Sequence, residues 1–292
     1  MRKIINSFVQ VSILLCFMVI FSLNKINVYA SDDIPTVTLD AGHDSFHTGA
    51  SANSLNEEKL NLIITNYCRD YLENNSTIKV YLSRENFNCP YPDTPYKDCN
   101  YERLMKAKTL GTDLFYSIHC NYNPHNILNG ASVIIPNTNY KPVFNTKGLK
   151  IADIIKTNYK DILPVTEIYT RDSDEGTIED RENFYPDETR ADYYNVNRTS
   201  KYNNFLGIIV EHGFLSNSND ADILSNTNML KQLGEADAKS IIEYFESEGY
   251  DCRKECKENK KILEENIIKV KKALIKTKNP SIVKFSYILD EK

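Results

Sequence analysis

The chain has 292 residues, of which 41% are hydrophobic, and this is enough chain for one large domain with a substantial core. Its formal net charge is −5, and the charge without residues 1–30 is −8, since those residues contain three basic residues and no acidic ones. So acidic a chain is unsuited to nucleic acid or to an anionic membrane surface, because both require dense cationic contacts.

Residues 1–30 have the three-part pattern of a secretory signal peptide. Arg2 and Lys3 provide a positive start, residues 11–23 form an apolar run, and residues 28–30 resemble a small-x-Ala cleavage site. The apolar run is short for a membrane span, so we expect a secreted protein, with an uncleaved N-terminal anchor as the alternative. The expected organisation is a signal peptide over residues 1–30, a main domain over residues 31–250 and a tail over residues 251–292.

Strands and helices alternate along the main domain. Apolar and β-branched runs predict strands over residues 36–39, 78–84, 114–118, 131–136 and 206–211. Apolar residues at helical spacing predict helices over residues 57–73, 101–110, 146–159 and 228–245. This alternation predicts an α/β fold, in which a mixed, mostly parallel, twisted sheet carries helices on both faces.

Two segments do not continue this alternation. Residues 165–204 have little periodicity and many charged residues and tyrosines, so we assign no elements there. A loop of this length inside a compact domain is usually functional, flexible or misread as a loop. The tail over residues 251–292 is rich in Lys and Glu, and its apolar residues recur at roughly helical spacing. This predicts a C-terminal amphipathic helix docked on the main domain, with a partner-binding helix as the alternative.

Six cysteines lie after residue 30, an even number that permits disulfides in an exported protein. Cys89 and Cys99 flank a loop rich in Pro, Tyr and Asp and could close it. The spacing of the cysteines does not indicate a metal site, because no Cys-x-x-Cys pair is present. Cys68 lies in a predicted helix and Cys120 at the end of a predicted strand, where buried free thiols are common.

Three predicted strands end in residues that could carry chemistry. His43 follows the first strand, and His119 and Glu211 end two later ones. In α/β sheets ligands bind beyond the carboxyl ends of the strands, so we expect these side chains at one edge of the sheet. Each also has a simpler interpretation: a histidine after a strand is often a hydrogen-bonded loop or core residue, and Glu211 could end its strand in solvent.

Glu57 at the start of the first predicted helix could complete a metal site. Residues 54–57 also fit a capping box, which would give Glu57 a structural role. The helix dipole keeps a carboxylate at this position ionised, as a metal ligand must be. His43, Glu57 and His119 match the three-ligand set of zinc hydrolases, and Glu211 could accept the proton of a water that the metal acidifies. The four residues therefore predict metal-assisted hydrolysis of an amide.

Four sequence blocks, LDAGHDS, NEEKLNL, LFYSIHCN and GIIVEHGFLSN, occur in this order over about residues 34–250. Together they resemble the zinc-dependent N-acetylmuramoyl-L-alanine amidases of the amidase 3 family. The resemblance implies that His43, Glu57 and His119 bind one Zn²⁺ and that Glu211 is the catalytic acid–base residue. The family pattern favours Glu57 over Glu58 as the middle ligand. Further positions that resemble the family are Arg84, Arg103 and the segment over residues 192–200.

The chain departs from the family pattern at two places. Asp44-Ser45-Phe46 stands where a glycine-rich turn is expected, which leaves the shape of this loop open. His212 stands where many relatives have a smaller polar residue; it could shape the pocket or contact the substrate, but we do not expect a ligand. His47 and His125 have no family counterpart, and we expect both at the surface. An inserted segment occludes the metal in some relatives, and residues 165–204 could do so here.

The resemblance implies a secreted peptidoglycan hydrolase with a single catalytic domain. Its expected reaction is cleavage of the amide between the lactyl group of N-acetylmuramic acid and L-alanine of the stem peptide. The expected protein is a monomer that acts on peptidoglycan, with a partner or membrane-side contact through the tail. The alternatives are a zinc peptidase that acts on a stem-peptide bond and a non-catalytic wall-binding protein on the same fold. The latter would usually lack a ligand or Glu211, and both are present.

Overall fold

The computed structural model describes residues 33–94, 96–173 and 184–252 and six positions of the tail: 254, 262, 265, 266, 268 and 269. The predicted signal peptide or anchor lies outside the described residues, as does most of the tail. The six tail positions are helical, but Ile262 is 55% exposed and Ile268 50% exposed, so these two side chains do not pack closely on the domain. A search of the described residues finds no helix that is long and apolar enough to cross a membrane.

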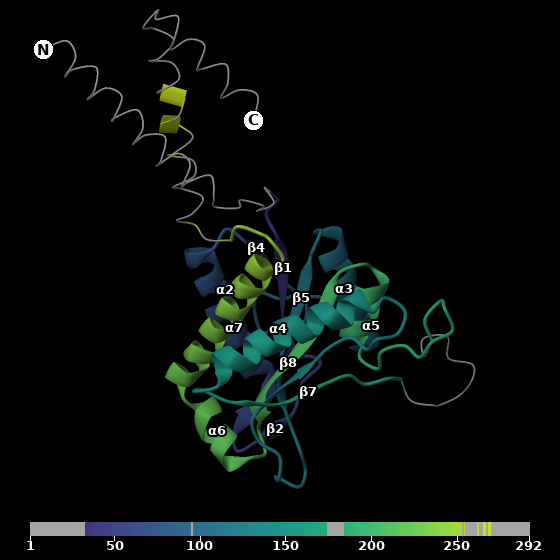
Figure 1. Ribbon diagram of the computed structural model, residues 1–292. Coiled ribbons are helices and arrows are strands. Elements are labelled where there is room, and N and C mark those ends of the chain that lie inside the picture. Colours follow the sequence, from purple (N-terminus) through teal and green to yellow (C-terminus); the bar gives the residue numbers. More distant parts are fainter. Residues whose placement is uncertain are drawn as a thin grey trace, which may run out of the picture.

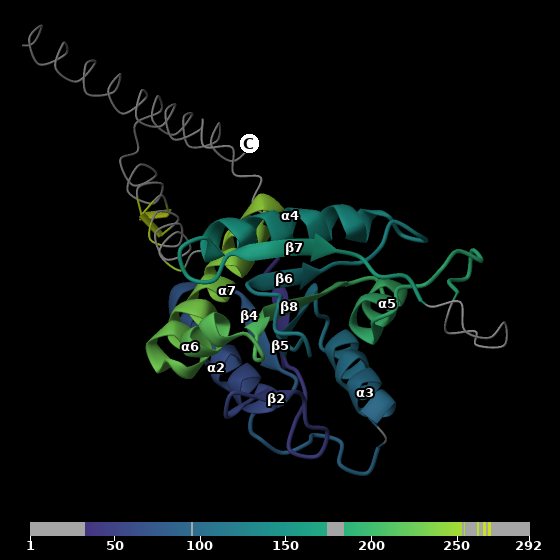
Figure 2. The same ribbon diagram turned by 90° about the horizontal axis from the view of Figure 1, so that it is seen from below.

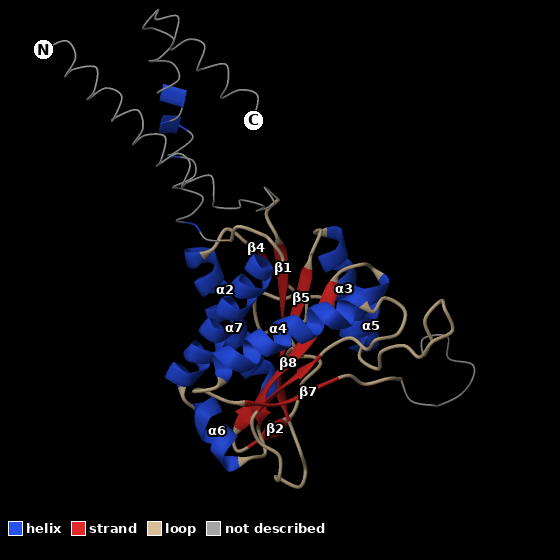
Figure 3. Cartoon of the chain, in the orientation of Figure 1, coloured by secondary structure: helices blue, strands red, loops and turns tan. Residues whose placement is uncertain are grey.

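The centre of the domain is a six-stranded sheet (Figures 1 and 3). Its strands are β1 (Thr36–Ala41), β4 (Lys79–Leu82), β5 (Leu114–Asn121), β6 (Ala131–Ile134), β7 (Val165–Tyr169) and β8 (Leu206–Phe214). The strand order is β4-β1-β5-β8-β6-β7, and β6 runs antiparallel to β8 while every other pair is parallel. The prediction of a mixed, mostly parallel sheet is confirmed.

Helices cover both faces of the sheet, as predicted (Figure 2). The described helices of the domain are α2 (Glu57–Asn75), α3 (Tyr96–Thr109), α4 (Val143–Tyr159), α5 (Asn195–Tyr202), α6 (Ser218–Ser225) and α7 (Thr227–Ser247). On one face α7 packs between α2 and α4, and on the other α3 packs against α5. α6 follows β8 and packs against both β8 and α7.

The alternation of side chains along each strand determines on which face of the sheet a residue lies. Along β8, Ile208 and Val210 belong to the larger core with α2, α4 and α7, whereas Ile209 belongs to the smaller core with α3 and α5. Successive side chains of a strand point to opposite faces. Glu211 therefore lies on the side of Ile209, and His212 lies on the side of the larger core.

The segment over residues 165–204, for which the sequence predicts no elements, is not a single long loop. It begins with β7, which pairs with β6 at the edge of the sheet, and it ends with α5. β7 has five residues and α5 has eight, and the buried residues of α5 are mostly polar, so neither element shows a long apolar period in the sequence. Residues 174–183 lie outside the described part, and the idea that this segment occludes the metal stays a prediction.

A small hairpin, β2 (Ser51–Ala52) and β3 (Leu55–Asn56), precedes α2 and was not expected. Asn53 and Ser54 form its turn with φ angles of 49° and 62°, the pair of positive φ values typical of a type I′ turn. The capping-box prediction is therefore wrong. Asn56, not Ser54, precedes the first helical residue, and it makes no side-chain cap hydrogen bond.

Candidate active site

Three potential metal ligands meet at the carboxyl edge of the sheet: His43 after β1, Glu57 at the start of α2 and His119 in β5. Glu57 Oε1 lies 2.9 Å from His119 Nδ1 and 3.4 Å from His43 Nε2. The two imidazole rings pack edge to face with their centroids 5.1 Å apart. One donor atom from each side chain therefore faces a common space, and we call these three residues the donor set.

The hairpin before α2 fixes the Glu57 carboxylate. The Glu57 N–H donates to the Ala50 carbonyl at 2.9 Å, and the Ala50 N–H donates to Glu57 Oε2 at 2.8 Å, which directs Oε1 toward the histidines. Burial raises the pKa of Glu57, but hydrogen bonds from His119 and His43 and their charges hold it well below its usual range. Glu58 is directed elsewhere, with Oε2 3.4 Å from the Gly49 nitrogen.

His43 has a backbone conformation that is uncommon outside glycine. Its φ angle is 61°, in the left-handed region, where a histidine persists when its surroundings hold it. Its Nδ1 lies 3.2 Å from the His47 carbonyl oxygen, which fixes the ring with Nε2 toward Glu57. Burial lowers the pKa of His43, but the hydrogen bond and charge of Glu57 and the bond to His47 raise it above its ordinary value.

The Asp44 side chain shapes the turn that follows His43, in place of the expected glycines. Asp44 Oδ1 accepts the N–H groups of Phe46 at 2.9 Å and His47 at 2.7 Å, and the Asp44 N–H donates to the His47 carbonyl at 3.1 Å. An aspartate that caps its own turn is a common substitute for glycine in tight loops. The open question about this loop is thereby answered by a local hydrogen-bond network.

Two buried arginines hold the chain around the donor set. Arg103 Nη2 donates to Asp44 Oδ2 at 2.7 Å and to the His43 carbonyl at 3.2 Å, and its Nη1 donates to Asp40 Oδ1 at 3.0 Å. Arg84 donates to the carbonyls of Ala41 at 2.8 Å and Glu58 at 2.7 Å. The two positions that resemble the family therefore fix the backbone beside the ligands.

Two glycines lie against the donor set. A Cβ on Gly42 would be 2.2 Å from His119 Cε1, and a Cβ on Gly49 would be 2.4 Å from Glu57 Oε2 and 2.7 Å from His43 Cδ2. Real Cβ atoms do not approach other atoms so closely, so a side chain at either position would displace a ligand. The contact of Gly49 could not be predicted from the sequence, because only the hairpin brings Gly49 close to Glu57.

A cavity of about 330 Å³ opens on the donor set and also contains Glu211. Asn121, Tyr122 and Tyr194 form part of its wall. His119 and Glu211 are register partners on the neighbouring strands β5 and β8, so their side chains lie on the same side of the sheet. The structure thus brings together all four residues that the sequence singled out.

The Glu211 carboxyl is in an unusual environment. Its Oε2 atom is buried and has no hydrogen-bond partner among the described residues. Burial, and secondarily the negative charge of Glu57, raise the pKa of Glu211 to about 8. An acceptor without a donor, on the wall of a cavity beside three potential metal ligands, is suited to proton transfer.

The remaining histidines differ in their environments. His212 is fully buried, with Nε2 2.7 Å from the Tyr159 hydroxyl and 3.0 Å from Asp237 Oδ2. It contacts α4 and α7 on the far face of the sheet, so the idea that it contacts substrate is wrong. His125 is exposed, as predicted. His47 is not a surface residue, since its side chain is only 8% exposed and lies 3.3 Å from Asp44.

The chemistry of the donor set fits a zinc ion. Two imidazole nitrogens and one carboxylate oxygen are a ligand set of catalytic zinc sites, and their donor atoms lie within 4.8 Å of one another. The two glycines leave space where side chains would otherwise enter. The second ring nitrogen of His43 is oriented by a backbone carbonyl, as in many zinc sites.

Comparison with known proteins points to one family. A family model described as N-acetylmuramoyl-L-alanine amidase matches residues 37–243. The chain is 28% identical over 210 residues to N-acetylmuramoyl-L-alanine amidase LytC of Bacillus subtilis, covering 72% of this chain and 35% of LytC. Cwp6 from Clostridium difficile has a similar fold (TM-score 0.57, 24% identity, 73% of this chain and 30% of that chain).

The N-acetylmuramoyl-L-alanine amidase from Clostridium difficile 630 also has a similar fold, with a TM-score of 0.56 and 21% identity over 75% of this chain and 100% of that chain. At this level of identity the likeness of the structures shows the fold alone. The chain spans only about a third of the length of LytC, at 35%, and of Cwp6, at 30%.

Proposed function

This chain belongs to the amidase 3 family of N-acetylmuramoyl-L-alanine amidases, and we therefore propose that it hydrolyses peptidoglycan at the amide between N-acetylmuramic acid and L-alanine. The observation that carries the proposal is the cavity that His43, Glu57 and His119 share with Glu211, whose buried Oε2 has no hydrogen-bond partner among the described residues. The family resemblance of the four sequence blocks is confirmed. The roles of the individual residues are part of the proposal.

His43, Glu57 and His119 hold one zinc ion in this proposal. When bound, zinc supplies a Lewis acid that polarises the scissile carbonyl and lowers the pKa of the attacking water. Glu57 contributes a charge that stays negative throughout the neutral range, since its pKa lies well below the usual range. His43 and His119 contribute neutral nitrogens, so zinc and the donor set together would carry a net charge of about +1.

Glu211 moves the proton. Its carboxylate takes a proton from the attacking water and then donates it to the nitrogen of the departing alanine. Because Oε2 is buried without a partner, the carboxyl is neither held by a salt bridge nor stabilised in its charged form by hydrogen bonds from the described residues. Its raised pKa of about 8 suits a group that must both accept and release a proton near neutral pH.

The test combines one substitution with product analysis. Glu211→Gln keeps the size of the side chain but cannot accept the proton, so we expect zinc content to be unchanged and turnover to fall by about 10²–10⁴-fold. Purified cell walls are digested and the new N-terminal amines are labelled. N-terminal alanine and an intact glycan are expected from the wild-type chain.

His125→Ala is the matched control, because His125 is exposed, and it should keep full activity. New amines at other stem-peptide residues would support a zinc peptidase instead, and zinc binding without any cleavage would support a non-catalytic wall-binding protein. Unchanged turnover in Glu211→Gln would overturn the role of Glu211 alone. We also propose that the chain is secreted to the cell wall, as the N-terminal pattern suggests, and that it acts there as a monomer.

A further inference from the structure

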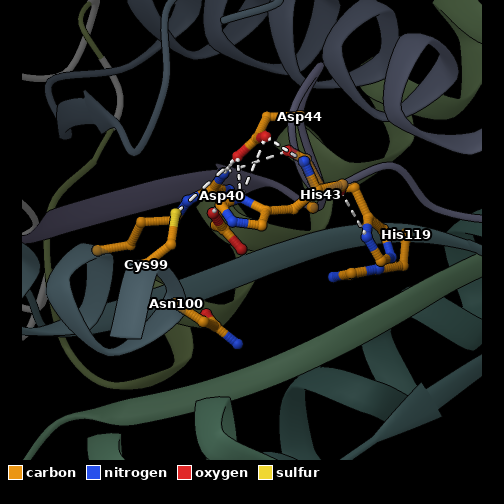
Figure 4. A pocket seen from close by; sticks show the side chains of 9 residues that line it. Asp40, His43, Asp44, Cys99, Asn100 and His119 are labelled. Atoms are coloured by element: carbon orange, nitrogen blue, oxygen red, sulfur yellow. Dashed lines mark hydrogen bonds and ion pairs between the residues drawn. The ribbon is translucent and has the colours of Figure 1, made fainter. Parts of the chain in front are cut away.

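A second group of potential metal ligands lies next to His43, on the far side from His119. It consists of four residues, which we call the loop cluster: Asp44, His47, Cys89 and Cys99. Asp44 and His47 come from the turn after β1, Cys89 from the loop after β4, and Cys99 from α3. Figure 4 shows Asp44 and Cys99 close together, with His119 on the other side of His43.

The donor atoms of the loop cluster are in mutual contact. Cys89 Sγ lies 3.6 Å from Cys99 Sγ and 3.6 Å from His47 Nδ1. Asp44 Oδ2 lies 3.9 Å from Cys99 Sγ and 3.3 Å from His47 Nδ1. Asp44 and Cys99 are buried, the His47 side chain is 8% exposed and Cys89 is half-buried. The group is therefore largely closed to solvent, which is typical of structural metal sites.

Four of the six distances in this group match edges of a tetrahedral zinc site, and the other two, Cys89 to Asp44 and Cys99 to His47, are within 4.8 Å. Ordinary bond lengths to zinc place two sulfur ligands about 3.8 Å apart, a sulfur and a nitrogen or oxygen about 3.6 Å apart, and a nitrogen and an oxygen about 3.4 Å apart. The four distances in the loop cluster, 3.6, 3.6, 3.9 and 3.3 Å, agree with this pattern to within a few tenths of an ångström. A disulfide requires the two sulfurs at about 2.0 Å, and Cys89 and Cys99 are free thiols.

We propose that the loop cluster binds a second zinc ion, with a structural role. Binding would release the two thiol protons to solvent, and two thiolates and one carboxylate would leave the site with a net charge of about −1. Arg103 lies beside this charge, with Nη2 2.7 Å from Asp44 Oδ2, and is itself buried. Two thiolates with one imidazole select zinc over magnesium or calcium, which prefer oxygen ligands only.

The second zinc ion would stabilise the loop after β1, which positions His43 in the donor set. Residues 42–50 and 83–94 contain no helix or strand, and the loop cluster joins them to each other and to α3. His47 is shared between the two sites, because its carbonyl orients His43 Nδ1 while its own Nδ1 faces the loop cluster. Binding of this ion can be tested separately from the proposed hydrolysis, since no residue of the loop cluster belongs to the donor set.

Metal content and cobalt spectroscopy test the proposal. The full chain is purified without added reductant, its zinc is counted, and a second sample is loaded with Co²⁺ alone. We expect two zinc ions per chain and a near-ultraviolet thiolate-to-Co²⁺ charge-transfer band, which histidine and glutamate ligands cannot produce. Cys99→Ser should lose one zinc and the band. His119→Ala should lose one zinc and keep the band, so a failure of the catalytic site is distinguished from a failure of this one.

Cys68→Ala is the matched control, because Cys68 is a buried thiol in the larger core, and it should keep both ions and the band. If Cys99→Ser does not fold, alkylation of the wild-type chain replaces it: added zinc should slow the modification of Cys89 and Cys99 at least tenfold. The proposal is overturned if the wild-type chain gives no charge-transfer band, if the band survives in folded Cys99→Ser, or if zinc does not protect the two thiols. Recovery of a Cys89–Cys99 disulfide from the purified chain would overturn it as well.

Discussion

Gly42 shows how strictly single residues are constrained at the donor set. Its Cα lies against the His119 ring, and even a methyl group would be 2.2 Å from His119 Cε1. The neighbouring backbone cannot move away, because Arg84 Nη2 and Asn61 Nδ2 both bind the Gly42 carbonyl, at 3.3 and 3.0 Å. The absence of a side chain is therefore a requirement of the site and not of the turn.

We predict that Gly42→Ala strongly weakens zinc binding at the donor set. The added Cβ would rotate His119 away from Glu57. Substitution of a residue that only orients a metal ligand commonly lowers metal affinity by about 10–100-fold. Because this clash is with the ligand itself, we expect zinc affinity to fall by at least about 10²-fold. Zinc affinity, measured by competition with a chelator, checks the prediction. Gly111→Ala is the control: its φ of 69° makes the substitution destabilising, but no atom lies within 4 Å of the added Cβ. Equal zinc affinity in the two variants would contradict the explanation.

At the scale of the elements, a buried charge joins α5 to the segment before it and to the loop after β6. Lys201 in α5 is fully buried, and its Nζ lies 2.8 Å from Asp192 Oδ2 and donates to Asn137 Oδ1 at 2.6 Å. Asp192 also accepts the Tyr185 hydroxyl at 2.5 Å and the Asn137 N–H at 2.6 Å. This network fastens the part of the chain before α5, which leads to Tyr194 on the cavity wall.

We predict that Lys201→Met destabilises the domain by about 3–5 kcal/mol, because it leaves a buried carboxylate without its partner charge. Chemical denaturation measures the change. The double variant Lys201→Met, Asp192→Asn should regain part of the loss, since both charges are then removed. Lys150→Ala breaks an exposed pair with Glu248 and should cost less than about 1 kcal/mol. If Lys201→Met alone is as stable as the wild-type chain, the Lys201–Asp192 pair is not important for stability.

At the scale of the whole molecule, the donor set joins parts of the chain that are far apart in the sequence. His43, Glu57 and His119 come from the loop after β1, the start of α2 and the end of β5. The metal site therefore exists only in the folded state. A ligand that binds only the folded state stabilises that state by about 2.7 kcal/mol when the ligand concentration is 100 times Kd. Zinc should therefore act on global stability as well as on catalysis.

We predict that adding zinc to the metal-free chain raises Tm by about 5–10 °C near neutral pH. The rise should shrink as the pH falls through the raised pKa of His43, because a protonated imidazole cannot bind the metal, whereas Glu57 stays ionised. Differential scanning calorimetry at several pH values checks this. In His119→Ala the rise should be smaller at every pH, and an equal rise in both proteins would show that the donor set does not bind the zinc.

Much of this protein follows from the sequence by itself. Apolar periodicity predicted the central strands, the long helices and the class of sheet, because long buried elements must repeat their apolar residues at fixed spacing. The order of strand and helix also placed His43, His119 and Glu211 at one edge. Short elements such as β2, β7 and α5 were missed, since a few residues fixed by tertiary contacts carry no period of their own.

Only the tertiary structure decided how the side chains meet. Three predictions were plausible but wrong: the capping box at Glu57, the surface position of His47 and the substrate contact of His212. A hairpin precedes Glu57, and a turn closed by Asp44 buries His47. The alternation of side chains along β8 directs His212 to the opposite face of the sheet from Glu211. The loop cluster has no spacing motif at all, since its members come from three separate segments. Spacing along the chain reports local geometry, whereas such a site depends on packing between elements distant in sequence.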